Sequence, residues 1–274
     1  MKIFAIRDES TDEQVDLAYL LYYELEKRFY IELPESADPW ETPLLLSSFA
    51  KSGETSINSY WSKMWVQQRI VPTDRQNLGQ VLKDNNLKEY DEFGLLMLSM
   101  GRCAQDDYYL VPIEEDQLPD YMQKRFAKLI DDIVPLDDYA LLVFFRDGTV
   151  KKCSIKERYE HAPSFQVLFR NEDYFLAVNL QPGGHGIEWD VNLSVSAATL
   201  YRIGKKIPLT VSDFRNFVVH RVVNVAEAAE ILNCSRQNIE YLTRTGRLHP
   251  IKSSGKNTQY LKSEILKRNW QYRN

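Results

Sequence analysis

Four hydrogen-bonding side chains near the end of the chain recur at a spacing that a helix would place on one side. At about 100° per residue, a helix over residues 235–245 sets Ile239 and Leu242 on the same side as Ser235. The opposite side then carries Arg236, Gln237, Tyr241 and Arg244, with Glu240 among them. Such side chains donate hydrogen bonds to base edges and phosphates in the major groove of DNA. We therefore expect residues 235–245 to form a recognition helix that binds DNA through Ser235, Arg236, Gln237, Tyr241 and Arg244.

The segment before this helix carries the local signals of a partner helix and a tight turn. Asn224 and Glu227 have the spacing of a capping box at the start of a helix over residues 225–232. Two residues then make the turn, Ser235 caps the recognition helix, and Gly246 suits a left-handed helix end. Two short helices joined so tightly bury their apolar sides only against each other and a third element.

The segment after the recognition helix favours a basic hairpin, or wing. Two extended stretches, residues 247–252 and 258–261, flank a polar tip at residues 253–257. Ser263 then caps a last helix over residues 264–270. From this part of the chain we expect contacts to the DNA backbone by Arg247, Lys252, Lys256, Asn257 and Lys262.

With these motifs, residues 223–248 resemble the excisionase/MerR-type winged helix-turn-helix family. The resemblance implies a recognition helix at residues 235–245, a wing near residues 253–257 and double-stranded DNA as the partner. One such module covers a small footprint, so we expect a homodimer on paired half-sites. The alternative is a winged helix that docks a protein instead of DNA.

The distribution of charge supports a phosphate-binding module at the end of the chain. The whole chain has a formal net charge of −5. Residues 220–274 contain ten Lys and Arg against four Asp and Glu, a net charge of +6, so residues 1–219 carry −11. A basic segment on an acidic body is typical of a nucleic-acid-binding domain joined to domains with another role.

Length and composition indicate a globular, multidomain α+β protein. A chain of 274 residues exceeds one ordinary core, and 44% hydrophobic with 27% charged residues is typical of globular proteins. No run of eighteen apolar residues is present, and charges at Lys2 and Arg7 interrupt any signal-peptide core, so we expect no membrane partner. Three widely separated cysteines predict neither disulfides nor zinc and favour a reducing cytoplasm. We expect a bacterial-type protein.

The first domain, residues 1–118, is predicted to be mostly helical. Apolar residues recur at helical spacing over residues 12–29 and again over residues 55–70. A third helix is expected over residues 74–82, capped by Asp74. Residues 95–100 form a buried segment of either type, and residues 108–113 are strand-like.

The middle domain, residues 131–208, is predicted to be a small α+β unit with antiparallel hairpins. A polar helix over residues 120–133 leads into it, and residues 139–145 and 149–155 form a hairpin around Gly148. A second extended pair, residues 174–180 and 186–189, encloses a Pro-Gly-Gly turn, and residues 196–201 form a helix. With Phe175 and the Gly-Ile-Glu-Trp-Asp run at 186–190, this segment resembles the DUF2442 family, an uncharacterised α+β domain that implies no activity. Residues 211–219 connect it to the last domain, residues 220–274.

One cluster in the first domain has residue types that could support catalysis. Arg102, Cys103 and Asp106 lie within eight residues, and a second polar cluster includes Arg69, Asp74 and Arg75. We expect a structural polar network of paired charges, with no catalytic residue, cofactor or metal. An enzymatic role predicts instead that Arg102 and Asp106 line a cleft.

The sequence therefore predicts a non-enzymatic, DNA-binding regulatory protein whose first two domains sense a small effector or bind a protein partner. The alternatives are a protein-interaction adaptor and a toxin–antitoxin-type component with activity in the N-terminal domain.

Overall fold

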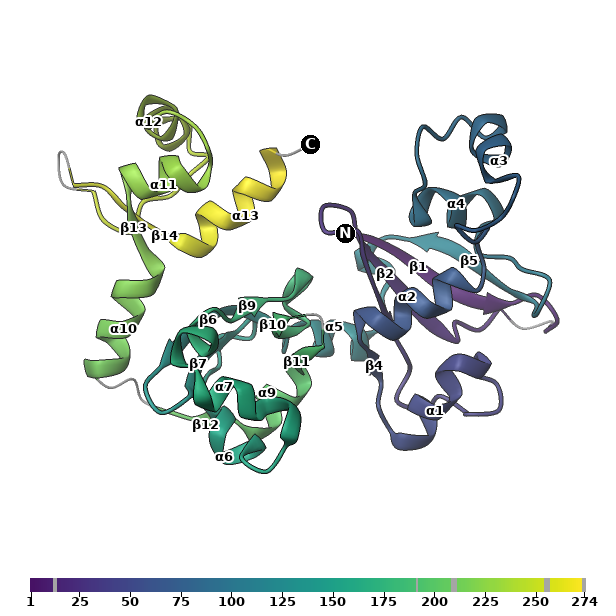
Figure 1. The fold of residues 1–274 in the computed structure, drawn as a ribbon, viewed down its shortest axis with the longest axis horizontal. Coiled ribbons are helices and arrows are strands. Elements are labelled where there is room, and N and C mark those ends of the chain that lie inside the picture. The colour runs from purple at the N-terminus through teal and green to yellow at the C-terminus, as the bar shows by residue number, and fades with distance from the viewer. Residues whose placement is uncertain (12–13, 191, 208–210, 254–256, 273–274) are drawn as a thin grey trace. The chain divides into compact units, whose positions relative to one another are not determined.

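The computed structural model describes every residue except 12–13, 191, 208–210, 254–256 and 273–274 (Figure 1). The chain divides into two compact units, Met1–Lys124 and Arg125–Asn274. In the part of the chain that the structure describes, no helix is long and apolar enough to cross a membrane.

The first unit is built on a five-stranded antiparallel sheet in the order β4-β3-β2-β1-β5. Its strands are β1 (Lys2–Asp8), β2 (Ala18–Tyr23), β3 (Arg28–Glu32), β4 (Ser56–Ile57) and β5 (Tyr108–Ile113). Its helices are α1 (Leu44–Ser52), α2 (Ser59–Gln67), α3 (Leu78–Asp84) and α4 (Glu92–Ser99), followed by η1 (Glu115–Gln117). Helix α5 (Asp120–Phe126) spans the boundary of the two units.

The prediction of a mostly helical first domain is wrong, and residues 12–29 show why. They contain β2 and the start of β3, with Lys27 at φ 52° in the turn between the strands. Leu20 and Leu21 are adjacent in β2, and both are completely buried. A strand that is buried on both faces loses its alternating pattern, and apolar residues three or four apart then resemble one side of a helix.

Helix boundaries differ from the predictions where another residue provides the N-terminal cap. Within residues 55–70 the helix begins only at Ser59, because Asn58 Oδ1 accepts from Trp61 N at 3.1 Å and the preceding residues form β4. Helix α3 begins after Asn77, so Asp74 does not cap it. In the segment at 95–100, residues 95–99 lie in α4 and Met100 follows as its left-handed C-cap. The strand at residues 108–113 is confirmed as β5.

The second unit begins with two antiparallel sheets. The first has the order β12-β8-β7-β6, and the second has the order β11-β10-β9. The strands are β6 (Ile130–Leu136), β7 (Ala140–Phe145), β8 (Val150–Ser154), β9 (Asn179–Leu180), β10 (Gly186–Asp190), β11 (Leu193–Ser196) and β12 (Lys205–Lys206). The short helices are α6 (Ile155–Tyr159), η2 (Pro163–Phe165), α7 (Gln166–Arg170), α8 (Glu172–Leu176), η3 (Pro182–Gly184) and α9 (Ala197–Ile203).

The hairpin expected around Gly148 is confirmed as β7 and β8, and the helix expected at residues 196–201 is confirmed as α9. Two expectations for this region are wrong. The helix predicted over residues 120–133 ends at Phe126, because the residues from Ile130 onward enter the sheet as β6. Most of residues 174–180 is not extended, because Asn171 Oδ1 accepts from Tyr174 N at 3.1 Å and starts α8.

The Pro-Gly-Gly turn between β9 and β10 is packed against the first sheet. Gly184 has φ +77°, and a Cβ at this position would lie 2.0 Å from the carbonyl oxygen of Ile130. The following residue, His185, is only 7% exposed, and burial lowers the pKa of its imidazole to about 3. The turn therefore holds the two sheets together.

The C-terminal part of the second unit consists of short helices around a two-stranded sheet. Its elements are α10 (Val211–Arg221), β13 (Val222–Asn224), α11 (Val225–Ile231), α12 (Arg236–Arg244), β14 (Gln259–Leu261) and α13 (Lys262–Tyr272). Strands β13 and β14 pair antiparallel. Residues 211–219, expected to connect the middle domain to the last one, lie in α10. The predicted cap at Ser263 is wrong, because α13 already begins at Lys262.

We predict that Gly184→Ala destabilises the protein by at least about 2 kcal/mol, since it adds a backbone clash to an unfavourable positive φ. Gly148→Ala is the matched control: Gly148 has φ +79° with no atom within 4 Å of the added Cβ, so only the cost of the dihedral, about 1 kcal/mol, is expected. Urea unfolding of the two variants measures the difference. Equal losses of stability would contradict the close packing of Gly184 on β6.

Candidate nucleic-acid interface

Side-chain caps fix the ends of the two helices that form the core of the C-terminal module. Asn224 Oδ1 accepts from the backbone amides of Ala226 and Glu227 at 2.8 and 3.0 Å. In return, Asn224 N donates to Glu227 Oε2 at 2.7 Å, which completes the predicted capping box. Ser235 Oγ accepts from Asn238 N at 3.2 Å and starts α12. Gly246, at φ 68°, follows the helix in the left-handed conformation that the sequence predicts.

Burial of one side of α12 decides which side faces solvent. Ile239 and Leu242 are 0% and 1% exposed and pack in a cluster with Ala228 and Ala229 of α11. The alanines allow a close approach of the two helices, since a small side chain keeps little distance between their axes. The same cluster includes Tyr260 of β14.

The structure brings the predicted recognition residues together on the solvent-facing side of α12. All five predicted side chains are exposed, namely Ser235, Arg236, Gln237, Tyr241 and Arg244. Tyr241 is 46% exposed, and the guanidinium of Arg244 lies 5.9 Å from the centre of its ring. Glu240 is exposed on the same side. This surface offers a planar ring and several hydrogen-bond donors next to one another.

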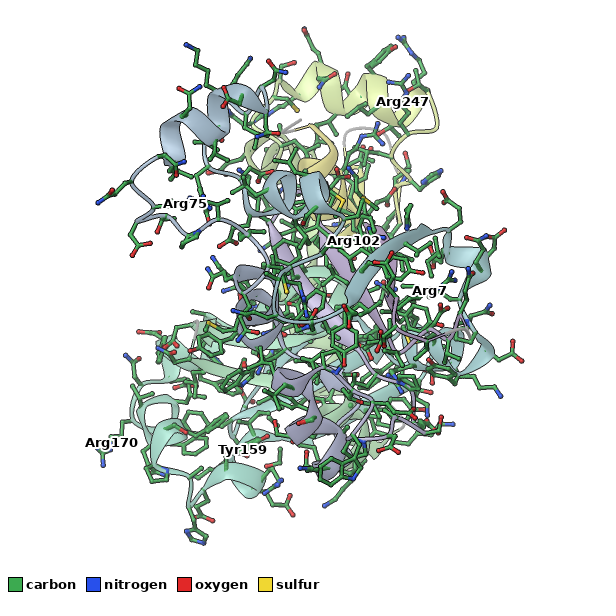
Figure 2. All side chains as sticks on the ribbon, turned by 90° about the vertical axis from the view of Figure 1, so that its right-hand side faces the viewer. Arg7, Arg75, Arg102, Tyr159, Arg170 and Arg247 are labelled. Atoms are coloured by element: carbon green, nitrogen blue, oxygen red, sulfur yellow. The ribbon has the colours of Figure 1, made fainter. Side chains whose placement is uncertain are left out.

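The residues predicted to contact the DNA backbone lie in the segments that follow α12. Arg247, Lys252 and Asn257 are exposed, and Lys262 is half-buried at the start of α13. Arg247 is labelled in Figure 2. Lys256, at the predicted tip of the wing, lies outside the described residues.

Two backbone hydrogen bonds join the segments that the predicted wing requires. Ile251 N donates to Gln259 O at 2.9 Å, and Gln259 N donates to Lys252 O at 2.8 Å. Strand β14 continues from this point but pairs with β13, a partner that the sequence analysis did not foresee. This pairing places Gln259–Leu261 in contact with the start of the module.

Two side-chain contacts that the sequence analysis missed hold these segments to the helices. The hydroxyl groups of Thr243 and Tyr260 are 2.7 Å apart and join α12 to β14. Arg268 of α13 donates to the backbone carbonyl of Arg247. No local spacing signals such contacts, because the partners are seventeen and twenty-one residues apart.

Two ion pairs join the helix-turn-helix segment to β6. Arg221 Nε donates to Ile133 O at 2.6 Å and lies 3.2 Å from Asp132 Oδ1. Lys267 Nζ lies 2.7 Å from Asp131 Oδ1. Burial raises the pKa of Asp132 even though the charge of Arg221 opposes the shift.

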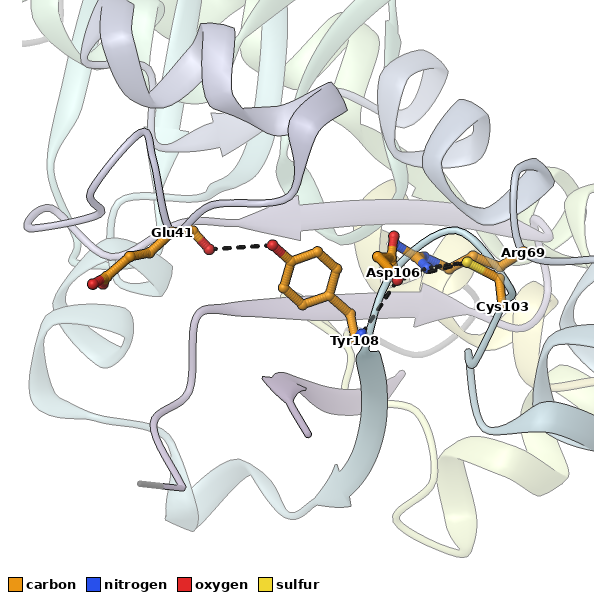
Figure 3. Close-up of polar contacts among 5 residues, drawn as sticks. All are labelled: Glu41, Arg69, Cys103, Asp106 and Tyr108. Carbon is orange, nitrogen blue, oxygen red and sulfur yellow. Dashed lines mark hydrogen bonds and ion pairs between the residues drawn. The ribbon is translucent and has the colours of Figure 1, made fainter. Parts of the chain in front are cut away.

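The polar cluster predicted in the first unit forms around a buried guanidinium (Figure 3). Arg69 Nη1 and Nη2 donate to the two carboxylate oxygens of Asp106 at 2.8 and 2.7 Å, and Nη1 also lies 3.0 Å from Cys103 Sγ. The guanidinium carbon sits 3.9 Å from the centre of the Trp65 ring. Burial by itself raises the pKa of Asp106, but the hydrogen bonds and charge of Arg69 outweigh it and leave the pKa below its ordinary value.

A cleft of about 590 Å³ opens beside this ion pair. Its lining combines aromatic and polar side chains. The aromatic rings are those of Phe49, Trp61, Trp65 and Tyr108, and the polar side chains are those of Ser48, Gln68, Arg69, Gln105 and Asp106. Arg102, by contrast, is an exposed side chain that pairs with Glu9 at 3.2 Å. Arg75 is likewise separate and donates to Asn77 Oδ1 at 2.8 Å. The predicted cluster thus splits into a buried pair and solvated charges.

The comparisons with known proteins agree with both predicted family resemblances. Residues 130–206 match the family model of the protein of unknown function DUF2442, and residues 222–268 match a helix-turn-helix domain model. Neither a curated protein nor a solved structure matches the chain. The helix-turn-helix match covers α11, α12 and β14 and supports DNA binding by this part of the protein.

We predict that Asp106→Asn lowers the free energy of unfolding at pH 7 by about 3 kcal/mol, because it leaves the charge of Arg69 buried without its counter-ion. The pKa of Asp106 is lower in the folded than in the unfolded state, so this stabilisation is complete above the ordinary value of 3.8 and is lost as the pH falls through the folded-state pKa. The gap between parent and variant should therefore close in acid. Urea unfolding at several pH values measures it, with the exposed neighbour Asp107→Asn as the control; a gap independent of pH would contradict the assignment.

Proposed function

We propose that the protein is a DNA-binding regulator that holds duplex DNA with the helix-turn-helix of residues 222–268. The single observation that carries the proposal is the solvent-facing side of α12, which gathers Arg236, Gln237, Tyr241 and Arg244 over a buried apolar side. The net charge of +6 over residues 220–274 adds the long-range attraction that phosphates require.

The proposed division of labour follows from where the side chains lie. Residues of α12 enter the major groove and distinguish base pairs through hydrogen bonds to base edges. The cations after the helix, Arg247, Lys252 and Lys262, contact phosphates and contribute affinity without sequence preference. The segments joined by the hydrogen bonds of Ile251 and Lys252 with Gln259 act as a wing, and two copies of the chain occupy paired half-sites.

The first unit has the properties of a sensing domain. Residues 1–124 contain twelve Lys and Arg against twenty-three Asp and Glu, a net charge of −11 that repels DNA. The cleft beside the Arg69–Asp106 pair has the size of a small-molecule site and combines four aromatic rings with several polar groups. We propose that occupation of this cleft regulates the DNA-binding module.

The test is selection of a preferred duplex from a random pool by the full chain, followed by Arg236→Ala. We expect this variant to lose about 1–3 kcal/mol of binding free energy for the selected duplex, because a base contact disappears. Lys252→Ala should weaken selected and random duplexes equally, since a phosphate contact is independent of sequence. Fluorescence anisotropy measures both affinities.

The control for these variants is Lys88→Ala, an exposed lysine of the acidic unit, which should leave both affinities unchanged. If Arg236→Ala binds the selected duplex as tightly as the parent does, α12 is not the recognition helix. Sedimentation of the protein–DNA complex tests the proposed dimer. A complex of one chain with one selected duplex would contradict it.

A further inference from the structure

The segment between the acidic unit and the helix-turn-helix is neutral overall, but its charges are not evenly distributed. Residues 125–219 contain twelve Lys and Arg and twelve Asp and Glu. Two short stretches, residues 151–158 and 202–206, contain only one acid, Glu157, and seven of the twelve cations: Lys151, Lys152, Lys156, Arg158, Arg202, Lys205 and Lys206. The rest of the segment is correspondingly acidic.

The fold brings these two stretches together although about fifty residues separate them in the sequence. Strand β12 pairs antiparallel with β8, with Lys205 opposite Lys152 and Lys206 opposite Lys151. Residues directly opposite on antiparallel strands have their side chains on the same face, and like charges in such pairs are destabilising. We call these two pairs the lysine ladder. Repulsion between the opposed ammonium groups of the ladder opposes folding.

Protection of a sheet edge accounts for only half of this arrangement. Strand β12 lies at the edge of its sheet, and lysines on an edge strand discourage pairing with another chain. That role explains Lys205 and Lys206. It does not explain the two lysines of β8, which lies between β12 and β7.

Each of the two lysines on one face of this pairing has an acid nearby, at the long end of the ion-pair range. Lys152 Nζ lies 3.8 Å from Asp213 Oδ1, and Lys205 Nζ lies 3.8 Å from Glu157 Oε1. The side chains of Lys205 and Glu157 are 79% and 70% exposed, and solvent screens a pair of this kind. Lys151 is different, because its ammonium donates to Tyr201 O and lies 3.9 Å from the centre of the Tyr201 ring.

A cleft of about 410 Å³ lies on the face that Lys152 and Lys205 share. Ser154 and Arg158 add a hydroxyl group and a second type of cation to its lining, Glu157 adds its one carboxylate, and Ile203 and Ile207 supply apolar surface. The pKa of Tyr159, labelled in Figure 2, rises through burial, and the charges of Arg158 and Arg202 near its ring oppose that rise. The arginines of α6 and α9 thus extend the basic surface beyond the lysine ladder.

We propose that this face of β8 and β12, with Arg158 and Arg202, is a second phosphate-binding surface that contacts the backbone of duplex DNA. The proposal rests on the proposed function. A series of cations along two strands and two helices suits a polyanion, because duplex DNA presents one phosphate charge about every 1.7 Å along its axis. Phosphates placed between Lys152 and Lys205 would also remove the repulsion across the ladder.

The test compares the salt dependence of DNA binding by the full chain and by the Lys152→Ala/Lys205→Ala variant. We expect the slope of log affinity against log salt to decrease by about 1.8, the value for two lost phosphate contacts, and affinity at low salt to fall about tenfold. The preference for the selected over a random duplex should not change. Lys152→Arg/Lys205→Arg should retain the parental slope.

The control is Lys83→Ala/Lys88→Ala, which removes two exposed lysines from the acidic unit and changes the net charge equally. A slope that is unchanged in the β8–β12 variant, or that falls equally in the control, overturns the second surface. If Arg236→Ala still lowers sequence preference in that case, the proposed function stands without it. If the parent protein binds no duplex, both proposals fail.

Discussion

Burial of Ile239 and Leu242 against the alanines of α11 is the constraint on which the C-terminal module depends. Helices of seven and nine residues are too short to be stable alone, so they form only where they can pack together. This packing fixes the rotation of α12 and turns its arginines toward solvent. Tyr260 enters the same cluster and bonds to Thr243, so the strand after the helix is positioned by the same core.

Charge is organised in the chain by element as well as by domain. The acidic first unit, the neutral middle segment and the basic end differ in net charge, and the middle segment collects its cations on β8, β12 and the adjoining helices. Acidic residues of the middle segment also pair with basic residues near the end of the chain. Asp131 and Asp132 of β6 pair with Lys267 of α13 and Arg221 of α10 and connect the C-terminal part to the preceding sheet. Such contacts give the DUF2442-like segment a physical connection to the module that binds DNA.

The sequence predicted the parts whose signals are local. Asn224, Ser235 and Gly246 act within three residues or through their own dihedral angles, so the caps and the helix ends could be located in advance. The first unit was not predictable in this way, because Leu20 and Leu21 are both buried and the strand shows no alternation. Contacts such as Lys152 opposite Lys205, or Arg69 with Asp106, depend on distant parts of the chain that meet only in the fold.

The most direct test of the account is the affinity of the full chain for random duplex DNA, measured by fluorescence anisotropy over a series of salt concentrations. The account predicts binding whose log affinity falls linearly with log salt, with a slope that corresponds to several phosphate contacts. Absence of binding, or an affinity independent of salt, would contradict DNA binding by the helix-turn-helix and leave the exposed side of α12 as a surface for a protein partner.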